Sequence, residues 1–228
     1  IFFIKDRKNP SSISSHHLLN KKILANLDHS KAIKFKNINQ TVGAIIVART
    51  SSNRLENKAI KKINNAESIS QVITRIKKIK SLDKIILATS TDKSDNILEK
   101  IARREKIICF RGSLNNVASR FYMAAKKHKL DQIVRITGDA ILCDEVMLEK
   151  AIKNQLEKGT DVTFIKNMPY GTAREVFTFN TIKTITQNAE VPRNTEYLEW
   201  FLENSRNFKV SYIKSNYKFN KSIRLTLD

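Results

Sequence analysis

The stretch that decides the fold runs from Thr41 to Lys58 and reads TVGAIIVARTSSNRLENK. Residues 42–47 form an unbroken apolar run, which predicts a strand buried on both faces of a sheet. The loop after it carries Arg49, Ser52, Arg54 and Lys58. A cationic loop at the carboxyl end of a buried strand is where open α/β sheets bind ligands, and its charges and N–H groups suit a polyphosphate. On local composition alone, a basic surface turn explains the loop equally well.

Downstream of this stretch, strand-like and helix-like segments alternate. Such alternation predicts right-handed βαβ units, and therefore an α/β fold with a mostly parallel central sheet and helices on both faces. The expected strands are residues 42–47, 84–89, 107–110, 132–137 and 161–165, followed by 175–179, 208–213 and 223–227. Three helices are expected between the first four strands. The first has an apolar face from Ile69 to Ile79, the second is capped by Asp92 or Ser94 and turns Ile97, Leu98 and Ile101 inward, and the third is capped by Ser113. Further helices are expected at residues 144–158, 180–189 and 194–204.

Composition limits the function classes. The 228 residues carry a formal net charge of +20, but the lysines are scattered along every expected helix and do not alternate with aromatic residues, so nucleic acid is not expected as a partner. The apolar runs are strand-length, so no transmembrane helix is expected. The opening residues, IFFIKDRKNP, do not read as a signal peptide, and we expect a cytoplasmic protein. Cys109 and Cys143 show no metal-ligand spacing and are expected to be buried, reduced thiols.

Polar residues follow three expected strands and should meet at one edge of the sheet. The first loop holds Arg49 and Arg54, the second begins Arg111-Gly112-Ser113, and the third reads Arg135-Ile136-Thr137-Gly138-Asp139. Asp139 is a hard oxygen ligand suited to Mg²⁺, and Asp228 could supply a second carboxylate. Carboxylates, a metal ion and several cations form a site for nucleotidyl transfer. Taken singly, Asp139 is better explained as a turn residue that caps its own backbone, whereas the set of residues after successive strands favours a site.

The same residues carry a resemblance to a known family. VGAIIVARTSSNRLENK, residues 42–58, is similar to the ARxxSxRLPGK signature of sugar-acid cytidylyltransferases. Residues 110–148 resemble the RGS…DVLxRY…RxTGDxPL block of the spore coat polysaccharide biosynthesis cytidylyltransferase-like family, which is related to the acylneuraminate and 3-deoxy-manno-octulosonate cytidylyltransferases. Residues 170–179, 193–210 and 223–228 resemble its later blocks in the right order.

This resemblance implies a nucleotide-diphospho-sugar transferase (GT-A-like) fold and a reaction in which CTP and a sugar acid give a CMP-sugar and pyrophosphate. It also implies a role of this reaction in surface polysaccharide biosynthesis. Its motifs imply catalytic roles for Arg49, Arg54, Lys58 and Asp139, and a metal site of Asp139 and Asp228. They imply nucleotide binding by Ala48, Arg49, Ser52, Arg54, Arg111, Arg135 and Gly138, and sugar-acid binding by Glu175 and Arg193. Sheet enzymes of this type often pair, which allows a homodimer.

The sequence also departs from the family pattern. Glu56-Asn57 replaces Pro-Gly in the signature, Ile141 replaces Pro after Gly-Asp, and the chain stops at Asp228, before the acidic pair and final helix of the family. We therefore expect residues 41–228 to be a C-terminally truncated nucleotidyltransferase domain. Residues 18–38 weakly resemble the end of the SAF domain of sialic-acid synthases, so residues 1–40 are expected to be the tail of a preceding domain in a fusion to such a synthase.

Two other functions remain open at this level. A nucleotide-sugar glycosyltransferase can use the same sheet, although such enzymes more typically show an Asp-x-Asp metal motif, which is absent from this sequence. A degenerate, non-catalytic nucleotide-binding domain is favoured slightly by Glu56-Asn57 and by the truncated end. Neither the identity of the sugar acid nor the choice of CTP over another nucleotide follows from the residues themselves.

Overall fold

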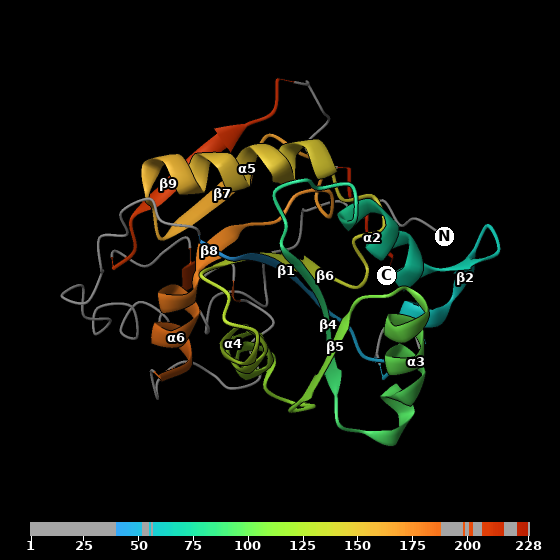
Figure 1. The fold of residues 1–228 in the computed structure, drawn as a ribbon. Coiled ribbons are helices and arrows are strands. Elements are labelled where there is room, and N and C mark those ends of the chain that lie inside the picture. Colours follow the sequence, from blue (N-terminus) through green and yellow to red (C-terminus); the bar gives the residue numbers. More distant parts are fainter. Residues whose placement is uncertain are drawn as a thin grey trace, which may run out of the picture.

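The computed structural model describes residues 40–51, 55, 57–187, 198, 201–202, 207–216 and 223–227. Its centre is a seven-stranded sheet (Figure 1) whose strands are β1 (Val42–Val47), β4 (Lys84–Ser90), β5 (Ile108–Gly112), β6 (Gln132–Thr137), β7 (Val162–Lys166), β8 (Val176–Thr178) and β9 (Val210–Lys214). Their order is β5-β4-β1-β6-β8-β7-β9. Within this sheet β8 alone is antiparallel to its neighbours, so the predicted mostly parallel sheet is confirmed.

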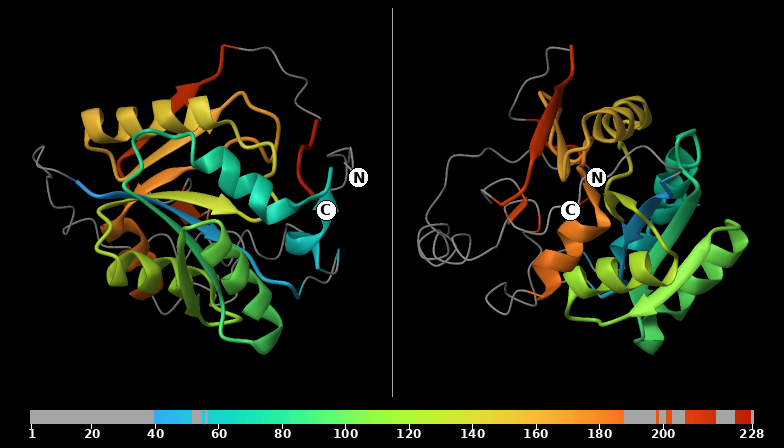
Figure 2. Two further views of the ribbon diagram at one scale, coloured as in Figure 1. Left: turned by 45° about the vertical axis from the view of Figure 1, so that its right-hand side comes forward. Right: turned by 60° about the vertical axis from the view of Figure 1, so that its left-hand side comes forward.

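Helices cover both faces of the sheet, as the alternation of segments predicts. Apolar residues of α2 (Ser68–Ile76), α3 (Asn96–Arg104) and α5 (Glu145–Lys158) pack into one buried cluster, and those of α4 (Val117–Lys127) and α6 (Phe179–Gln187) into the other. Figures 1 and 2 show α5 on one side of the strands and α4 and α6 on the opposite side. Two short 3₁₀ turns, η2 (Lys58–Ile60) and η3 (Lys93–Asp95), follow β1 and β4.

The first strand illustrates why the apolar run becomes the centre of the core. Val42, Ala44 and Ile46 enter the cluster with α2, α3 and α5, whereas Ile45 enters the cluster with α4 and α6. Successive side chains of a strand point to opposite faces, so a strand covered on both faces must be apolar throughout. Gly43 leaves room for Leu130, whose Cδ1 would lie 2.4 Å from a Cβ atom at that position.

The ends of α5 agree with the prediction, whereas a different residue from the predicted one caps α4. At α5, Asp144 accepts hydrogen bonds from the N–H groups of Val146 and Met147, and Gly159 ends the helix in the left-handed region with φ of 54°. The predicted cap of α4 by Ser113 is wrong. Asn116 caps this helix by accepting from Ser119 N–H at 2.8 Å.

Two further predictions differ from the structure, and one element was not predicted. Ile97 is 39% exposed rather than inward, because the buried face of α3 is Leu98, Ile101 and Ala102. Residues 223–227 form no strand; among the described residues they make an isolated bridge between Arg224 and Tyr170. The sequence analysis also missed a small hairpin of β2 (Lys62–Ile63) and β3 (Ala66–Glu67), whose turn residues Asn64 and Asn65 both have positive φ.

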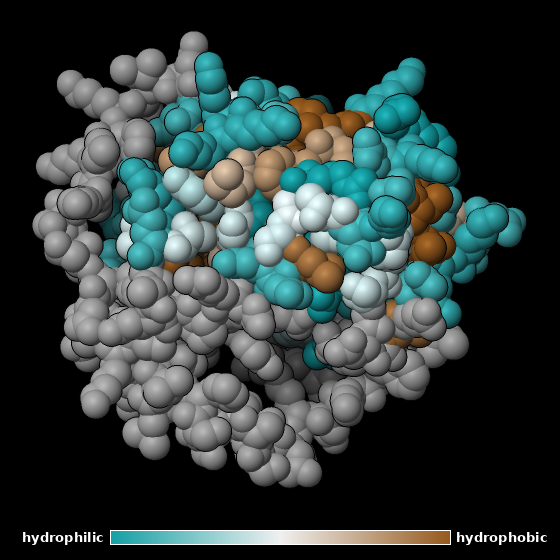
Figure 3. Space-filling view, turned by 90° about the horizontal axis from the view of Figure 1, so that it is seen from below, coloured by the Kyte–Doolittle hydropathy of each residue, from teal (hydrophilic) through white to brown (hydrophobic). Residues whose placement is uncertain are grey.

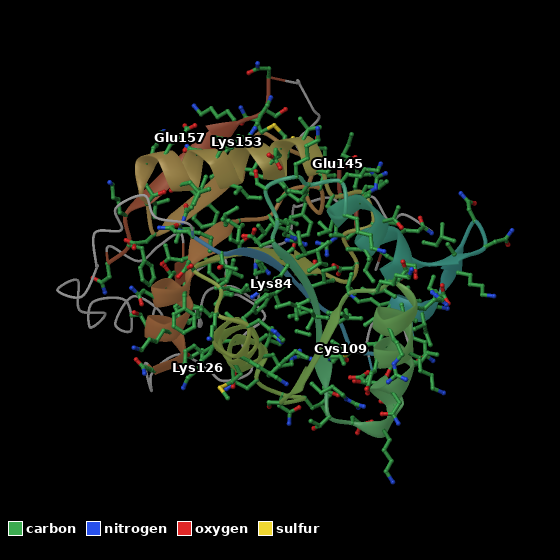
Figure 4. The ribbon with its side chains drawn as sticks, in the orientation of Figure 1. Lys84, Cys109, Lys126, Glu145, Lys153 and Glu157 are labelled. Carbon is green, nitrogen blue, oxygen red and sulfur yellow. The ribbon has the colours of Figure 1, made fainter. Side chains whose placement is uncertain are left out.

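Charged residues are spread over the described surface, as the sequence predicts. Figure 3 shows small, separate hydrophobic patches among hydrophilic residues on one face, and Figure 4 shows Lys84, Lys126, Glu145, Lys153 and Glu157 on three different elements. No helix of the described residues is long and apolar enough to cross a membrane. The predictions for residues 1–39, and most of the helix predicted at 194–204, fall outside the described residues.

Candidate active site

The strand ends that were predicted to meet do meet at one edge of the sheet. Val47 of β1 is paired in register with Ala88 of β4 and with Thr137 of β6. Arg49 and Asp139 each lie two residues beyond this paired level, so both belong to the carboxyl edge of the sheet. Open α/β sheets place their ligands at this edge.

An ion pair joins two of the predicted site residues across this edge. Lys58 Nζ donates to Asp139 Oδ2 at 2.9 Å, although the two residues are 81 positions apart. Their side chains are 18% and 15% exposed, respectively. The structure therefore brings together Lys58, predicted to hold phosphate, and Asp139, predicted to hold a metal ion.

Asp139 is held as a carboxylate. Burial tends to raise its pKa, but the charge of Lys58, hydrogen bonds from Thr137 and Lys58, and the charge of Arg174 outweigh burial and lower the pKa below its usual value. The Oδ1 atom is enclosed and has no hydrogen-bond partner among the described residues. A buried carboxylate oxygen without a donor is a suitable ligand for a cation.

Backbone geometry at Asn57 positions Lys58. Asn57 adopts the left-handed conformation, with φ of 55° and ψ of 24°, and its N–H donates to Thr50 C=O at 3.1 Å. Asparagine therefore takes the place of the family glycine here, in a conformation that it tolerates better than most residues. Ser68 fixes the other side of the turn by donating its hydroxyl to the carbonyl groups of Lys58 and Ala59.

Gly138 and Ala48 serve close packing between β1 and β6. A Cβ atom at Gly138 would lie 2.8 Å from Ala48 Cβ and 3.3 Å from Val47 O, and Gly138 N–H donates to Val47 O at 2.9 Å. Ala48 is buried. Small residues at both positions thus let the loops that carry Arg49 and Asp139 lie side by side.

Asp95, which the sequence analysis did not select, ties the loop after β1 to the end of β4. Its Oδ1 accepts from Thr50 N–H at 2.7 Å and from Thr50 Oγ1 at 2.8 Å, and its Oδ2 accepts from the N–H and hydroxyl of Ser90. Burial works against its ionisation, but these hydrogen bonds lower the pKa of Asp95 below its usual value. No spacing signal in the sequence separates Asp95 from an ordinary turn residue.

Three predicted ligand-binding residues are engaged with protein groups. Arg111 donates to the carbonyl groups of Ser90 and Asp92 and also to Asn96 and Glu99, which fixes the turn after β4. Arg135 and Glu175 form a buried, two-point ion pair between β6 and the start of β8 and are only 6% and 1% exposed. This geometry favours a positioning role for all three residues, and their ligand contacts stay predictions.

Arg174 lies beside Asp139, one position before the predicted Glu175, and the sequence analysis did not select it. It is buried, its Nη2 donates to the Thr137 hydroxyl at 3.2 Å, and its charge contributes to the lowered pKa of Asp139. Tyr170 carries two cations near its ring, with Arg174 at 5.4 Å and Arg224 at 4.4 Å from the ring centroid. Positive charge therefore gathers on the β8 side of Asp139, where the sequence analysis had expected Glu175.

The remaining predicted site residues, Ser52, Arg54, Arg193 and Asp228, lie outside the described residues. The segment that precedes Asp228 is close to the site, because Leu227 N–H donates to Asp139 C=O at 3.2 Å. Among the described residues no group of three or more His, Cys, Asp or Glu side chains could hold a metal ion. Magnesium does not require such a group, since it is commonly bound by one or two carboxylates together with substrate phosphates.

Comparisons with known proteins show which family the chain resembles. An uncharacterized protein of Methanocaldococcus jannaschii is 37% identical over 186 residues, covering 81% of this chain and 76% of that protein. The spore coat polysaccharide biosynthesis protein SpsF of Bacillus subtilis is 28% identical over 191 residues, covering 81% and 80%. A cytidylyltransferase structure from Leptospira borgpetersenii superposes with a TM-score of 0.77 at 25% identity, covering 83% of this chain and 82% of that one.

The fold extends to more distant enzymes. The structure of a CMP:2-keto-3-deoxy-manno-octonic acid synthetase complexed with CTP has a TM-score of 0.61 at 11% identity, covering 77% of this chain and 91% of that one. Residues 43–223, most of the chain, match the cytidylyltransferase family. The chain belongs to the cytidylyltransferase family and has its nucleotide-diphospho-sugar transferase-like fold.

Proposed function

We propose that the chain transfers CMP from CTP to a sugar acid of the nonulosonate or octulosonate type, releasing pyrophosphate, in surface polysaccharide biosynthesis. The observation that carries this proposal is the Lys58–Asp139 ion pair at the carboxyl edge of the sheet, in a chain of the cytidylyltransferase family. SpsF, the relative from Bacillus subtilis, is named for spore coat polysaccharide biosynthesis, which supports the pathway class.

The proposed chemistry is a single displacement at phosphorus. The anomeric hydroxyl oxygen of the sugar acid bonds to the α-phosphorus, the bond from that phosphorus to the bridging oxygen of pyrophosphate breaks, and the hydroxyl proton is lost to the surroundings. No covalent protein nucleophile is needed, so the protein acts by positioning and by charge. Lys58 and Arg49 bind phosphate oxygens, where their charges stabilise the pyrophosphate as it leaves.

Asp139 is the proposed protein ligand for Mg²⁺, with Asp228 as the predicted second carboxylate. The fit rests on the lowered pKa of Asp139 and on its enclosed Oδ1 atom, which has no donor among the described residues. When bound, the ion would neutralise charge that grows on the phosphates during transfer.

The acceptor is proposed to lie on the β8 side of Asp139. A sugar acid carries a carboxylate, which an arginine guanidinium can bind through two hydrogen bonds. Arg174 and Arg224 gather around Tyr170 on that side, and Arg174 is close enough to Asp139 to influence its pKa. We assign the carboxylate of the acceptor to this pair of arginines, in addition to the predicted Arg193.

The test is pyrophosphate release by the purified chain with CTP, Mg²⁺ and a panel of eight- and nine-carbon sugar acids. Parallel reactions with UTP test the choice of base. Release that requires one sugar acid and prefers CTP would establish the reaction and identify the acceptor. An Arg174→Met variant should raise the KM for that acid and leave the KM for CTP nearly unchanged.

The alternatives give different results. Saturable, Mg²⁺-dependent CTP binding without pyrophosphate release from any acid indicates a non-catalytic nucleotide-binding domain. Consumption of a CMP-sugar without pyrophosphate formation indicates a glycosyltransferase. A chain that does not bind CTP at all would refute the nucleotidyltransferase proposal.

A further inference from the structure

Arg120 is a buried cation, and two of its donor atoms find no acceptor among the described residues. It lies in the first turn of α4 and is 3% exposed. Its Nε and Nη1 atoms are enclosed, and neither has a hydrogen-bond partner in the described part of the chain. Arg135, another buried arginine, is instead paired at two points with Glu175. Buried polar groups are nearly always hydrogen-bonded, so Arg120 requires an explanation.

Within the described part of the chain, the charges that act on Arg120 do not neutralise it. Burial and the positive charge of Arg49 lower the pKa of Arg120 to about 10, against the influence of Asp95. Arg120 therefore remains protonated at neutral pH. Asp95 already accepts four hydrogen bonds, two from Thr50 and two from Ser90, and an ionised carboxylate offers about four acceptor positions. The guanidinium groups of Arg49 and Arg120 therefore lie near enough to repel each other, and that of Arg120 is enclosed.

The surroundings of Arg120 form part of the carboxyl edge of the sheet. The side chain starts in the first turn of α4, where free backbone N–H groups make the helix end positive. Its stem packs over the end of β5, since a Cβ atom at Gly112 would lie 3.1 Å from Arg120 Cγ. In the order of the sheet, β4 and β5 lie on one side of β1, whereas β6 with Asp139 lies on the other. Arg120 therefore extends the site past Arg49, away from the ion pair of Lys58 and Asp139.

We propose that Arg120 and Arg49 together bind an oxyanion, a phosphate group of the nucleotide, and that this ligand supplies the acceptors that Arg120 lacks. The identity of the ligand as a nucleotide rests on the proposed function; the oxyanion itself does not. Two guanidinium groups offer donors in the planar geometry that phosphate oxygens accept in pairs. A buried charge without a partner is unfavourable for the protein alone, so a bound anion explains why a positive side chain occupies this position.

The experiment compares an Arg120→Met variant with the unaltered chain by calorimetric binding of inorganic tripolyphosphate, CTP and cytidine in the presence of Mg²⁺. Methionine keeps most of the stem that packs over Gly112 but removes the charge. We expect the Kd for tripolyphosphate and for CTP to rise about ten- to hundredfold, the range typical of one hydrogen-bonded charge. We expect no change for cytidine. The thermal midpoint of the unliganded variant should not fall, because no partner is left unpaired.

Arg103→Met is the matched control, since it removes the same charge from an arginine on α3 whose side chain is 81% exposed. It should leave all three affinities unchanged. Unchanged tripolyphosphate affinity in Arg120→Met would overturn the proposal, and so would a loss confined to cytidine and CTP, which would assign Arg120 to the base. Tripolyphosphate binding needs neither base nor turnover, so a chain that forms no CMP-sugar can still pass or fail this test.

Discussion

Replacing Asp139 by asparagine separates the catalytic from the structural contribution of one side chain. At an effective dielectric constant of about 20, attraction between unit charges 2.9 Å apart is about 6 kcal/mol, most of which desolvation offsets. A hydrogen bond between charged groups contributes about 1.5–3 kcal/mol net to stability. The amide oxygen of asparagine would still accept a hydrogen bond from Lys58, which contributes about 1 kcal/mol. Asp139→Asn should therefore lower the free energy of unfolding by about 1–2 kcal/mol, or roughly 2–8 °C in Tm.

The same change should affect catalysis much more strongly. If Asp139 holds the metal ion, loss of its charge should lower kcat/KM for pyrophosphate release at least a hundredfold, as the removal of one charge-stabilising group does in other enzymes. The assays are pyrophosphate release and thermal unfolding followed by circular dichroism. Glu157→Gln, the same chemical change at an exposed position of α5, is the control and should alter neither quantity.

The pH dependence gives this prediction a sign. The folded-state pKa of Asp139 is lowered, so its stabilising contribution is present above the unfolded-state value of about 3.9 and is lost as pH falls through the folded-state value. The difference in unfolding free energy between Asp139→Asn and the unaltered chain should thus be largest at pH 7 and should shrink in acid below about pH 4. Unchanged turnover in Asp139→Asn, with the fold intact, would remove Asp139 from the mechanism. A stability difference that grows in acid would refute the assigned ion pair.

Three other changes test the structure around the site. Asp95→Asn should cost about 3 kcal/mol of unfolding free energy, measured by urea titration, because an amide cannot accept all four hydrogen bonds and leaves buried donors unpaired; full stability would contradict this network. Glu175→Gln should destabilise by about 3–5 kcal/mol by leaving the charge of Arg135 buried, and Arg135→Met in the same protein should recover part of that loss in a double-mutant cycle. Asn57→Gly should be neutral or slightly stabilising, whereas Asn57→Val should cost about 1–3 kcal/mol; equal stability of the two variants would show that the left-handed turn is not required.

Much of the fold is predictable because it depends on local patterns. The run from Val42 to Val47 contains no polar residue, and its short length favours a strand covered on both faces over a helix. Gly159 ends α5 as expected because the left-handed conformation at a helix end favours glycine. The edge that carries the site follows from the fold, since the carboxyl ends of parallel strands lie together. Asp139 and Lys58 could therefore be selected in advance.

Partners within the site were not predictable, because they depend on contacts between distant segments. Arg135 and Glu175, 40 residues apart, each follow the pattern of a ligand-binding residue, yet they form an ion pair with each other. Asp95 looks like a turn residue until Thr50 is placed beside it by the pairing of β1 with β4. Ile97 was assigned to the core because helical spacing alone does not fix which side of a short helix faces the sheet.

The candidate site contains a counter-ion for its own carboxylate. Lys58 neutralises Asp139, so a divalent cation that binds Asp139 must compete with an ammonium group 2.9 Å away. Nucleotide phosphates are acceptors that can draw Lys58 away from the carboxylate, and Asp139 would then be available to hold a cation whose charge offsets that of the phosphates. Reciprocity of binding free energies means that the cation and the nucleotide must then strengthen each other's binding by the same factor. Lys58 thus favours binding of the cation together with the nucleotide over binding of the cation alone.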